Sequence, residues 1–323
     1  MTTQTLAEQA AQAAGASLSR VVAIANDKGG VGKTSLTANL AALYAAAGYK
    51  VLAVDLNRQA NLSDDLGYRD NPDVDDQGIG LLNAIQHGRP LRPVPVPNRP
   101  GLDVIPGGTA LTDLTAIVLG QIGREGTKAY LRLARALATV AEGYDLILID
   151  TPPENTTLVD LALRAARWLI MPTKTDKGGL VGMKLLADRF VAAREQNPDL
   201  ELLGVVLFGT TRGRRDAEGN QALTAIQRRV RGKVEEAFGV GSSPVLSAMI
   251  CHSERIAEAA REGGRLAHEL ESDAASQPQW WEALRSGQRS GPRIPQTASN
   301  VAEDYRQLAA EILDILAAAE GAA

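Results

Sequence analysis

Residues 21–48 read VVAIANDKGGVGKTSLTANLAALYAAAG, and this stretch decides the fold class. A short apolar run at 21–26 is followed by a glycine-rich turn, and the turn is followed by an alanine-rich segment that ends at Gly48. Short apolar runs are typical of buried strands, and alanine-rich segments favour helices. A glycine-rich turn between a strand and a helix is the context that a phosphate-binding loop needs.

The same alternation continues along the chain. Further short apolar runs lie at 50–55, 102–106, 145–150, 168–172, 202–208 and 244–250. Continuous apolar strands that alternate with helices indicate a parallel sheet covered on both faces. We therefore expect an α/β fold with a doubly wound, mostly parallel sheet of about seven or eight strands, in which ligands bind beyond the carboxyl ends of the strands.

The length of 323 residues allows one large domain or two small ones. Residues 1–19 have little apolar surface to bury and are interpreted as an N-terminal arm. Turn formers and charges interrupt the pattern at about 272–298, which we interpret as an insertion. The remaining segments predict a single domain over 20–323.

Composition excludes several classes of protein. A single cysteine, Cys251, excludes a disulfide framework and a CxxC metal or iron–sulfur site within one chain. The formal net charge of −4 excludes a globally basic nucleic-acid coat but allows a local basic patch. No apolar run approaches the ~18 residues of a membrane span, and no signal peptide is recognised, so we expect a cytoplasmic protein.

The turn at 27–34 has the chemistry of a nucleotide site. Glycines let backbone N–H groups face phosphate oxygens, Lys33 neutralises β- and γ-phosphate charge, and the Thr34 hydroxyl can bind Mg²⁺. Asp27 stands where the usual first glycine would be, so a bare glycine-rich turn is the alternative. The predicted nucleotide-binding residues are Lys28, Gly29, Gly30, Val31, Gly32, Lys33, Thr34 and Ser35, with Thr210 as a candidate for adenine contact.

KGGVGKT with its second lysine, Lys28, resembles the deviant Walker A motif of ParA/MinD-type ATPases, which are P-loop NTPases. VDLNRQANLS at 54–63 resembles the VDxDPQGN segment of that family. Three further segments resemble later parts of the family: ILIDTPPENTTLVDLALRAARWLIMPT (147–173), PVLSAMICHSERIAEAAREG (244–263) and the terminal VAEDYRQLAAEIL. The resemblance covers roughly residues 20–320 apart from the insertion, which makes the match specific.

The resemblance implies a dimer in which two subunits enclose two ATP molecules with Mg²⁺. Lys28 would reach across to the phosphates of the partner, and Lys33 would bind the phosphates of its own subunit. Asp55 and Asp150 each end an apolar run, where they would hold Mg²⁺-bound waters together with Thr34. A helix cap or a turn acid is the alternative role for either aspartate.

Asn57 is where the chain departs from the family pattern, which has a second acid at this position. That acid helps to activate the attacking water, whereas an amide has one acceptor oxygen, two donor hydrogens and no useful basicity. We therefore expect ATP binding with slow hydrolysis. Two alternatives stay open: Asn57 orients water well enough with help from a partner, or it is a change introduced to trap the ATP state.

A basic segment follows the strand at 202–208. Seven bases against two acids lie between Arg212 and Lys233, a local balance of +5 in a chain of net charge −4. Such a cluster is typical of binding to the nucleic-acid backbone, although a solvated face is the alternative. The predicted DNA-binding residues are Arg212, Arg214, Arg215, Arg228, Arg229, Arg231, Lys233 and Arg255, the last from the family resemblance.

The predicted function is partition of a plasmid or chromosome by a homodimer that binds double-stranded DNA without sequence preference when ATP is bound, and so associates with the nucleoid. The resemblance implies a ParB-like centromere-binding protein or a cargo adaptor as the stimulating partner. Positioning of a non-DNA cargo and a metabolic ATP-dependent enzyme on the same fold remain alternatives. A MinD-like membrane cycle is disfavoured by the acidic C-terminal helix, and an iron–sulfur carrier by the single cysteine.

Overall fold

The computed structural model describes residues 18–174, 176–210, 225–238, 245–251, 256, 258, 263–276 and 298–322. Its strands are β1 (Val21–Ile24), β2 (Val51–Asp55), β3 (Val94–Pro95), β4 (Leu102–Ile105), β5 (Leu146–Asp150), β6 (Trp168–Thr173), β7 (Glu201–Thr210) and β8 (Val245–Cys251). Its α-helices are α2 (Lys33–Ala46), α3 (Asn61–Asp65), α4 (Ile79–His87), α5 (Leu114–Glu125), α6 (Arg132–Ala138), α7 (Thr156–Ala165), α8 (Lys177–Arg194), α9 (Ala225–Phe238), α11 (Ala267–Ser276) and α13 (Ala298–Ala322). Within these described residues, three short 3₁₀ helices lie at Thr109–Thr112, Gly126–Leu131 and Ala141–Gly143.

The strands form one eight-stranded sheet in the order β3-β4-β2-β5-β1-β6-β7-β8. All neighbouring pairs are parallel except β3, which runs antiparallel to β4 at one edge. This confirms the predicted mostly parallel, doubly wound sheet. The sequence did not indicate β3, which is two residues long and contains Pro95; proline is tolerated at a sheet edge because it has no N–H to donate.

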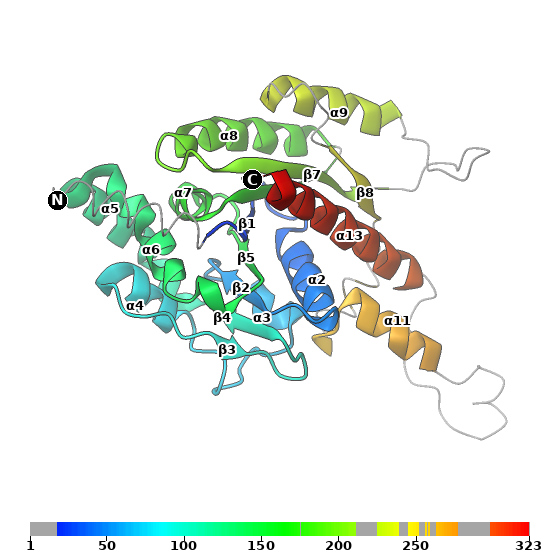
Figure 1. Ribbon diagram of the computed structural model, residues 1–323, viewed down its shortest axis with the longest axis horizontal. Coiled ribbons are helices and arrows are strands. Elements are labelled where there is room, and N and C mark those ends of the chain that lie inside the picture. Colours follow the sequence, from blue (N-terminus) through cyan, green and yellow to red (C-terminus); the bar gives the residue numbers. More distant parts are fainter. Residues whose placement is uncertain are drawn as a thin grey trace.

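Alternate residues of the strands enter two hydrophobic cores, one on each face of the sheet. On β5, Ile147 and Ile149 pack against the face covered by α4 to α9, while Leu146 and Leu148 face α2, α11 and α13. The two layers of helices lie on opposite sides of the sheet (Figure 1). Because both faces are covered, each inner strand is almost wholly apolar, which explains the continuous apolar runs of the sequence.

The polar segments follow the carboxyl ends of the central strands. β1 leads into the glycine-rich loop, β2 ends at Asp55, and β5 ends at Asp150. Because β5 lies between β1 and β2, these three ends meet at one edge of the sheet. Ligands bind at this position in doubly wound folds.

The domain boundaries remain predictions. Residues 1–17 of the predicted arm lie outside the described residues, while Leu18 is 8% exposed and packs into the core. The first residues of the predicted insertion, 272–276, are the last residues of α11, and 277–297 lie outside the described residues. Within the described part of the chain, no helix combines the length and the apolar character that crossing a bilayer requires.

Candidate functional site

The loop between β1 and α2 leaves the first turn of the helix open to an anion. Gly32 is the N-cap of α2, and no side chain caps the helix there. Its φ of 91° lies in the left-handed region that favours glycine, and a Cβ atom at this position would overlap the ring of Phe208. The uncapped N–H groups and the positive end of the helix dipole together can bind an anion such as a phosphate group.

Lys33 lies beneath this loop. Its Nζ donates to the backbone oxygens of Asn26 and Lys28, both at 3.0 Å, and the residue is only 6% exposed. Burial lowers the pKa of Lys33, while the charges of Asp150 and Asp27 raise it. The ammonium group is therefore held in place before any phosphate is present, which favours binding of a phosphate without a large loss of side-chain entropy.

Lys28 is held within its own subunit. Its Nζ lies 2.9 Å from both carboxylate oxygens of Asp176, the residue that caps α8. The start of α8 approaches the loop closely, because a Cβ atom at Gly182 would lie 3.2 Å from Cβ of Lys28 and 2.6 Å from Oδ1 of Asn26. Glycine in α8 therefore lets this helix contact the phosphate loop.

Two buried aspartates lie opposite each other at the ends of β2 and β5. Asp55 and Asp150 are register partners, and both are 0% exposed. Thr34 donates its hydroxyl hydrogen to Oδ2 of Asp150 at 2.7 Å, and the backbone N–H of Asn57 donates to Oδ1 of Asp55 at 2.7 Å. The second oxygens, Oδ2 of Asp55 and Oδ1 of Asp150, have no hydrogen-bond partner in the described part of the chain.

The electrostatics of this pair fit a divalent cation. Burial raises the pKa of Asp150 to about 7, with Thr34 and Lys33 opposing the shift. Burial and the charge of Asp150 raise the pKa of Asp55 well above its usual value. Two acids with unused oxygens beside a hydroxyl group match the oxygen ligands that Mg²⁺ prefers. Among the described residues no group of three or more His, Cys, Asp or Glu side chains is placed to hold a metal ion, and Mg²⁺ usually keeps several waters beside one or two carboxylates.

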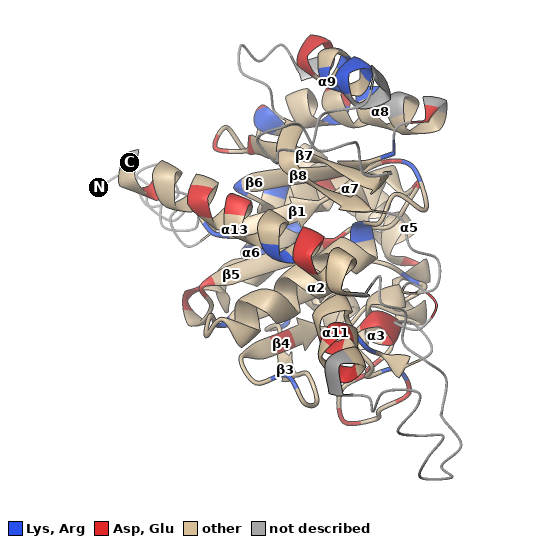
Figure 2. Cartoon of the chain, turned by 90° about the vertical axis from the view of Figure 1, so that its right-hand side faces the viewer, with Lys and Arg blue, Asp and Glu red and all other residues tan. Residues whose placement is uncertain are grey.

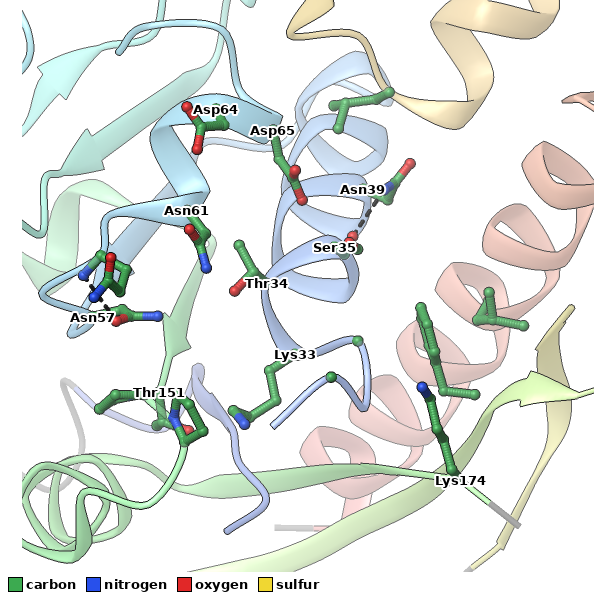
Figure 3. A pocket seen from close by; sticks show the side chains of 18 of the residues that line it. Lys33, Thr34, Ser35, Asn39, Asn57, Asn61, Asp64, Asp65, Thr151 and Lys174 are labelled. Carbon is green, nitrogen blue, oxygen red and sulfur yellow. Dashed lines mark hydrogen bonds between the residues drawn. The ribbon is translucent and has the colours of Figure 1, made fainter. Parts of the chain in front are cut away.

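Asn57 presents its amide nitrogen to the site. Its Oδ1 accepts the backbone N–H of Gln59 at 3.0 Å, which fixes the orientation of the amide because a backbone N–H can only donate. The nitrogen end of the side chain points across the pocket toward Lys33 and Thr34 (Figure 3). The side chain therefore offers hydrogen-bond donors to a ligand.

A pocket of about 690 Å³ runs along the loop and the start of α2 (Figure 3). Volumes of this order hold small molecules and cofactors. The segment after β2 lines one end of the pocket with Asn57, Arg58, Gln59 and Asn61. β7 and β8 lie on the other side of β1 in the sheet, and the pocket is apolar there, with Phe208, Ile250, Ile256, Val301 and Tyr305 in its wall.

The predicted nucleotide-binding residues divide into two groups. Gly30, Gly32, Lys33, Thr34 and Ser35 line the pocket. Lys28, Gly29, Val31 and Thr210 do not line it. Val31 is 0% exposed, and Thr210 is 5% exposed and pairs with Cys251 between β7 and β8. Adenine contact by Thr210 therefore remains a prediction.

Several pocket residues were not predicted from the sequence. Lys174 and Phe208 lie near the carboxyl ends of β6 and β7, a position that the strand predictions could have identified. Asn39 and Tyr305 come from the interiors of α2 and α13 and have no local signal. Arg58 lies beside Asn57 in the same loop, and only the topology shows that it reaches the pocket.

The described part of the basic segment is the amphipathic helix α9. Val230 and Val234 are 0% exposed and face the core next to α8. Arg228, Arg229, Arg231 and Lys233 are exposed, and α9 carries them on the outer surface of the molecule (Figure 2). Arg231 pairs with Glu235 at 3.4 Å. The other predicted DNA contacts, Arg212, Arg214, Arg215 and Arg255, lie outside the described residues.

Comparison with known proteins agrees with this geometry. Residues 19–202 match a family model described as an AAA domain. The sporulation initiation inhibitor protein Soj of Bacillus subtilis is 32% identical over 67% of this chain and 82% of its own length. The chromosome partitioning protein ParA of Caulobacter vibrioides is 35% identical over 68% of this chain and 79% of its own length.

Two solved structures of McdA from Cyanothece share the fold. The apo protein has a TM-score of 0.64 and 21% identity, with 83% of this chain and 98% of that chain covered. A variant in complex with ATP has a TM-score of 0.62 and 22% identity, with 85% and 98% covered. The family model spans the glycine-rich loop and both buried aspartates, and the Soj and ParA relatives each match about two thirds of the chain. The chain therefore belongs to the ParA/MinD-type family of partition ATPases.

Proposed function

We propose that this chain is an ATP-dependent switch for partition: two ATP-bound copies form a dimer, bind duplex DNA without sequence preference, and hydrolyse ATP slowly. The observation that carries the proposal is the pair of buried aspartates with unused oxygens beside Thr34 and an open helix N-terminus. This combination serves the binding of a nucleotide phosphate with a metal ion and has no evident structural purpose, because buried unpaired carboxylate oxygens are costly.

Each residue of the site has a role in binding. Thr34, Asp55 and Asp150 would hold Mg²⁺, directly or through water, and the ion would supply neutralisation of the triphosphate charge. Lys33 and the N–H groups that follow Gly32 would bind phosphate oxygens. The apolar end of the pocket, with Phe208 and Tyr305, suits the base, which places the terminal phosphate toward Asn57.

Slow hydrolysis follows from the orientation of Asn57. Its oxygen is already bonded to the N–H of Gln59, so the group that faces the pocket is a donor and cannot accept a proton from water. An aspartate in the same turn would use one oxygen for that N–H and present the other to the attacking water. With Asn57 in place, activation of the attacking water would depend on a partner, such as a ParB-like protein or a cargo adaptor.

Dimerisation would place two copies of α9 on one assembly. Each copy contributes the exposed cations Arg228, Arg229, Arg231 and Lys233. Joining two weak phosphate-binding surfaces raises the overall affinity for DNA, because the second contact becomes intramolecular. ATP would in this way control association with DNA, and we expect the ATP-bound protein on the nucleoid.

The first test compares this chain with its Asn57→Asp variant. ATP turnover is measured with nonspecific duplex DNA present, while the amount of protein retained on the DNA is recorded. We expect little turnover and strong ATP-dependent retention for this chain, with faster turnover and weaker retention for the variant. Equal turnover would show that Asn57 does not limit hydrolysis. No ATP-dependent retention in either form would favour a metabolic enzyme, and retention on a cargo protein alone would favour a positioning ATPase.

A further inference from the structure

The loop after β2 forms a tight turn at the polar end of the pocket. The backbone N–H of Ala60 donates to the oxygen of Asn57 at 3.0 Å, which closes a four-residue turn with Arg58 in its second position. The same oxygen of Asn57 accepts the N–H of Gly108 at 3.1 Å, and its side chain accepts the N–H of Gln59. The turn is therefore hydrogen-bonded both internally and to a neighbouring loop.

Arg69 holds the other side of this turn. Its Nη2 donates to the backbone oxygens of Gln59 at 2.9 Å and Ala60 at 2.8 Å. The guanidinium is itself anchored by a two-point ion pair with Asp64, in which Nη2 lies 2.7 Å from Oδ2. The backbone at Arg58 is consequently fixed before any ligand binds, as a binding residue requires.

The side chain of Arg58 is presented to the pocket without a partner of its own. Arg58 is exposed and lines the pocket beside Asn57. Within the ranges that the structure describes, its guanidinium makes no ion pair or hydrogen bond. Two acids of the following segment also line the pocket: Asp64 is already paired with Arg69, and Asp65 is buried, at 6% exposed.

The chemistry at this end of the pocket selects an anion. Asn57 presents N–H donors, and a guanidinium presents up to five more in a planar arrangement that matches phosphate oxygens. Asp55 and Asp150 are 0% exposed, do not line the pocket and are suited to a metal ion, whereas the acids that line the pocket are Asp64, Asp65 and Glu154. Because the base belongs at the apolar end, the terminal phosphate of a triphosphate is the anion that would lie closest to Arg58.

We infer that Arg58 binds the γ-phosphate of ATP within its own subunit and thereby makes the site prefer ATP over ADP. This inference rests on the proposed nucleotide site. A charge-assisted hydrogen bond to the γ-phosphate is lost when that phosphate leaves, so Arg58 stabilises the triphosphate state selectively. Together with the donor face of Asn57, this arrangement retains ATP and does not assist the attack of water.

The turn offers a matched set of variants. Proline is favoured in the second position of such turns because its fixed φ suits them, and the backbone N–H of Arg58 donates no hydrogen bond to any of the described residues. Arg58→Pro and Arg58→Gln both remove the charge. In Arg58→Pro, the fixed φ of proline keeps the turn. Arg58→Lys keeps the charge but loses the planar donor group. Arg92→Ala, at an exposed arginine outside the pocket wall, is the control.

Dissociation constants for AMPPNP and ADP, each with Mg²⁺, are measured by calorimetry for this chain and the variants, with melting temperature as the check on folding. We expect Arg58→Gln and Arg58→Pro to weaken AMPPNP binding about tenfold and ADP binding less than about twofold, which is the effect of one charge-assisted hydrogen bond. The AMPPNP affinity of Arg58→Lys should fall between that of these two variants and that of the parent. Arg92→Ala should bind both nucleotides as tightly as the parent does.

Two results would overturn the inference while leaving the proposed function intact. One is an equal loss of affinity for both nucleotides, which would show that Arg58 contacts a part of the nucleotide other than the γ-phosphate. The other is unchanged affinity in both charge-removing variants. Failure of the unchanged chain to bind either nucleotide would instead overturn the proposed function, and the inference with it.

Discussion

Lys28 and Asp176 form an ion pair in which one ammonium nitrogen lies 2.9 Å from both oxygens of one carboxylate. The pair joins the phosphate loop to Asp176, which is the N-cap residue of α8. Hydrogen bonding to Lys28 lowers the pKa of Asp176. In the proposed dimer, Lys28 extends toward the phosphates of the other subunit. It must first leave Asp176, so this contact competes with dimerisation.

Asp176→Asn should therefore promote ATP-dependent dimerisation. Asparagine caps a helix as well as aspartate does, so the hydrogen bond that Asp176 accepts from the N–H of Gly179 can be kept while the charge is lost. The pair is partly exposed, which limits its strength to about 1 kcal/mol per subunit; because both subunits release the pair, the gain in dimer affinity is limited to about thirtyfold. Sedimentation velocity with AMPPNP measures this, and unchanged dimerisation would show that the pair is not a barrier. Asp176→Ala removes the N-cap hydrogen bond as well as the charge. Comparing it with Asp176→Asn separates the loss of helix stability from the loss of the ion pair.

Asp150→Asn should stabilise the chain in the absence of divalent cations at pH 8. The folded state raises the pKa of Asp150 to about 7, from 3.8, so it holds a proton that the unfolded chain releases. Stability contributed by the protonated form is therefore lost as pH rises from about 4 to about 7. The amide cannot ionise, and we expect its melting temperature at pH 8 to exceed that of the parent by at least about 2 °C.

The same variant should gain no further stability from AMPPNP with Mg²⁺, because it lacks the negative charge that the metal ion requires. The control is Asp188→Asn, at an exposed acid on α8. It should change neither the melting temperature at pH 8 nor the stabilisation by AMPPNP with Mg²⁺. A melting temperature of Asp150→Asn below that of the parent at pH 8 would contradict the role of burial in this argument.

Arg189 links the phosphate loop to two helices. From α8 its Nε lies 3.4 Å from Oδ2 of Asp27, and its Nη1 lies 3.5 Å from Oδ2 of Asp160 on α7. The Asp27 side chain is only 9% exposed, and its Oδ1 has no partner within the described residues. Arg189→Met should destabilise the chain by about 1–3 kcal/mol, because it leaves a nearly buried carboxylate unpaired. Urea unfolding measures the change.

A double-mutant cycle separates pairing from packing. Once Asp27→Asn has removed the charge, Arg189→Met should cost clearly less than it does in the parent. Strictly additive effects would mean that Arg189 contributes through its apolar stem alone.

Sequence patterns were sufficient for the sheet and for the glycine-rich loop between β1 and α2, because both depend on local signals, while phosphate binding by that loop stays a prediction. The apolar runs that became β1, β2 and β5 are continuous because both faces of the sheet are covered. The orientation of Asn57 also depends on a local turn. By contrast, Arg189 meets Asp27 across 162 positions of the sequence, and no periodicity indicates such a contact.

The residues of the pocket wall were also not predictable from local sequence patterns. Phe208 packs over Gly32, and Tyr305 enters from the last helix, only because β7, β8 and α13 lie beside β1 and α2 in three dimensions. The order of strands in the sheet decides these neighbours, and strand order is not encoded in a short window of sequence. Arg58 was missed for a related reason: its residue type is ordinary for an exposed turn, and its importance comes from the pocket that the turn borders.

The basic face of α9 allows a test of DNA binding in which charge is changed without disturbing the core. Arg229 and Lys233 are exposed and one helical turn apart, while Arg231 is partly neutralised by Glu235. We expect Arg229→Gln with Lys233→Gln to weaken ATP-dependent DNA binding more than Arg231→Gln does. If each of the two contacts one phosphate, the slope of log affinity against log salt concentration should fall by about 1.8 per subunit. Arg135→Gln, at an exposed position on α6, should change neither quantity. Full DNA affinity in the double variant would exclude α9 as the DNA-binding surface, since helix packing through its buried valines would be unaffected.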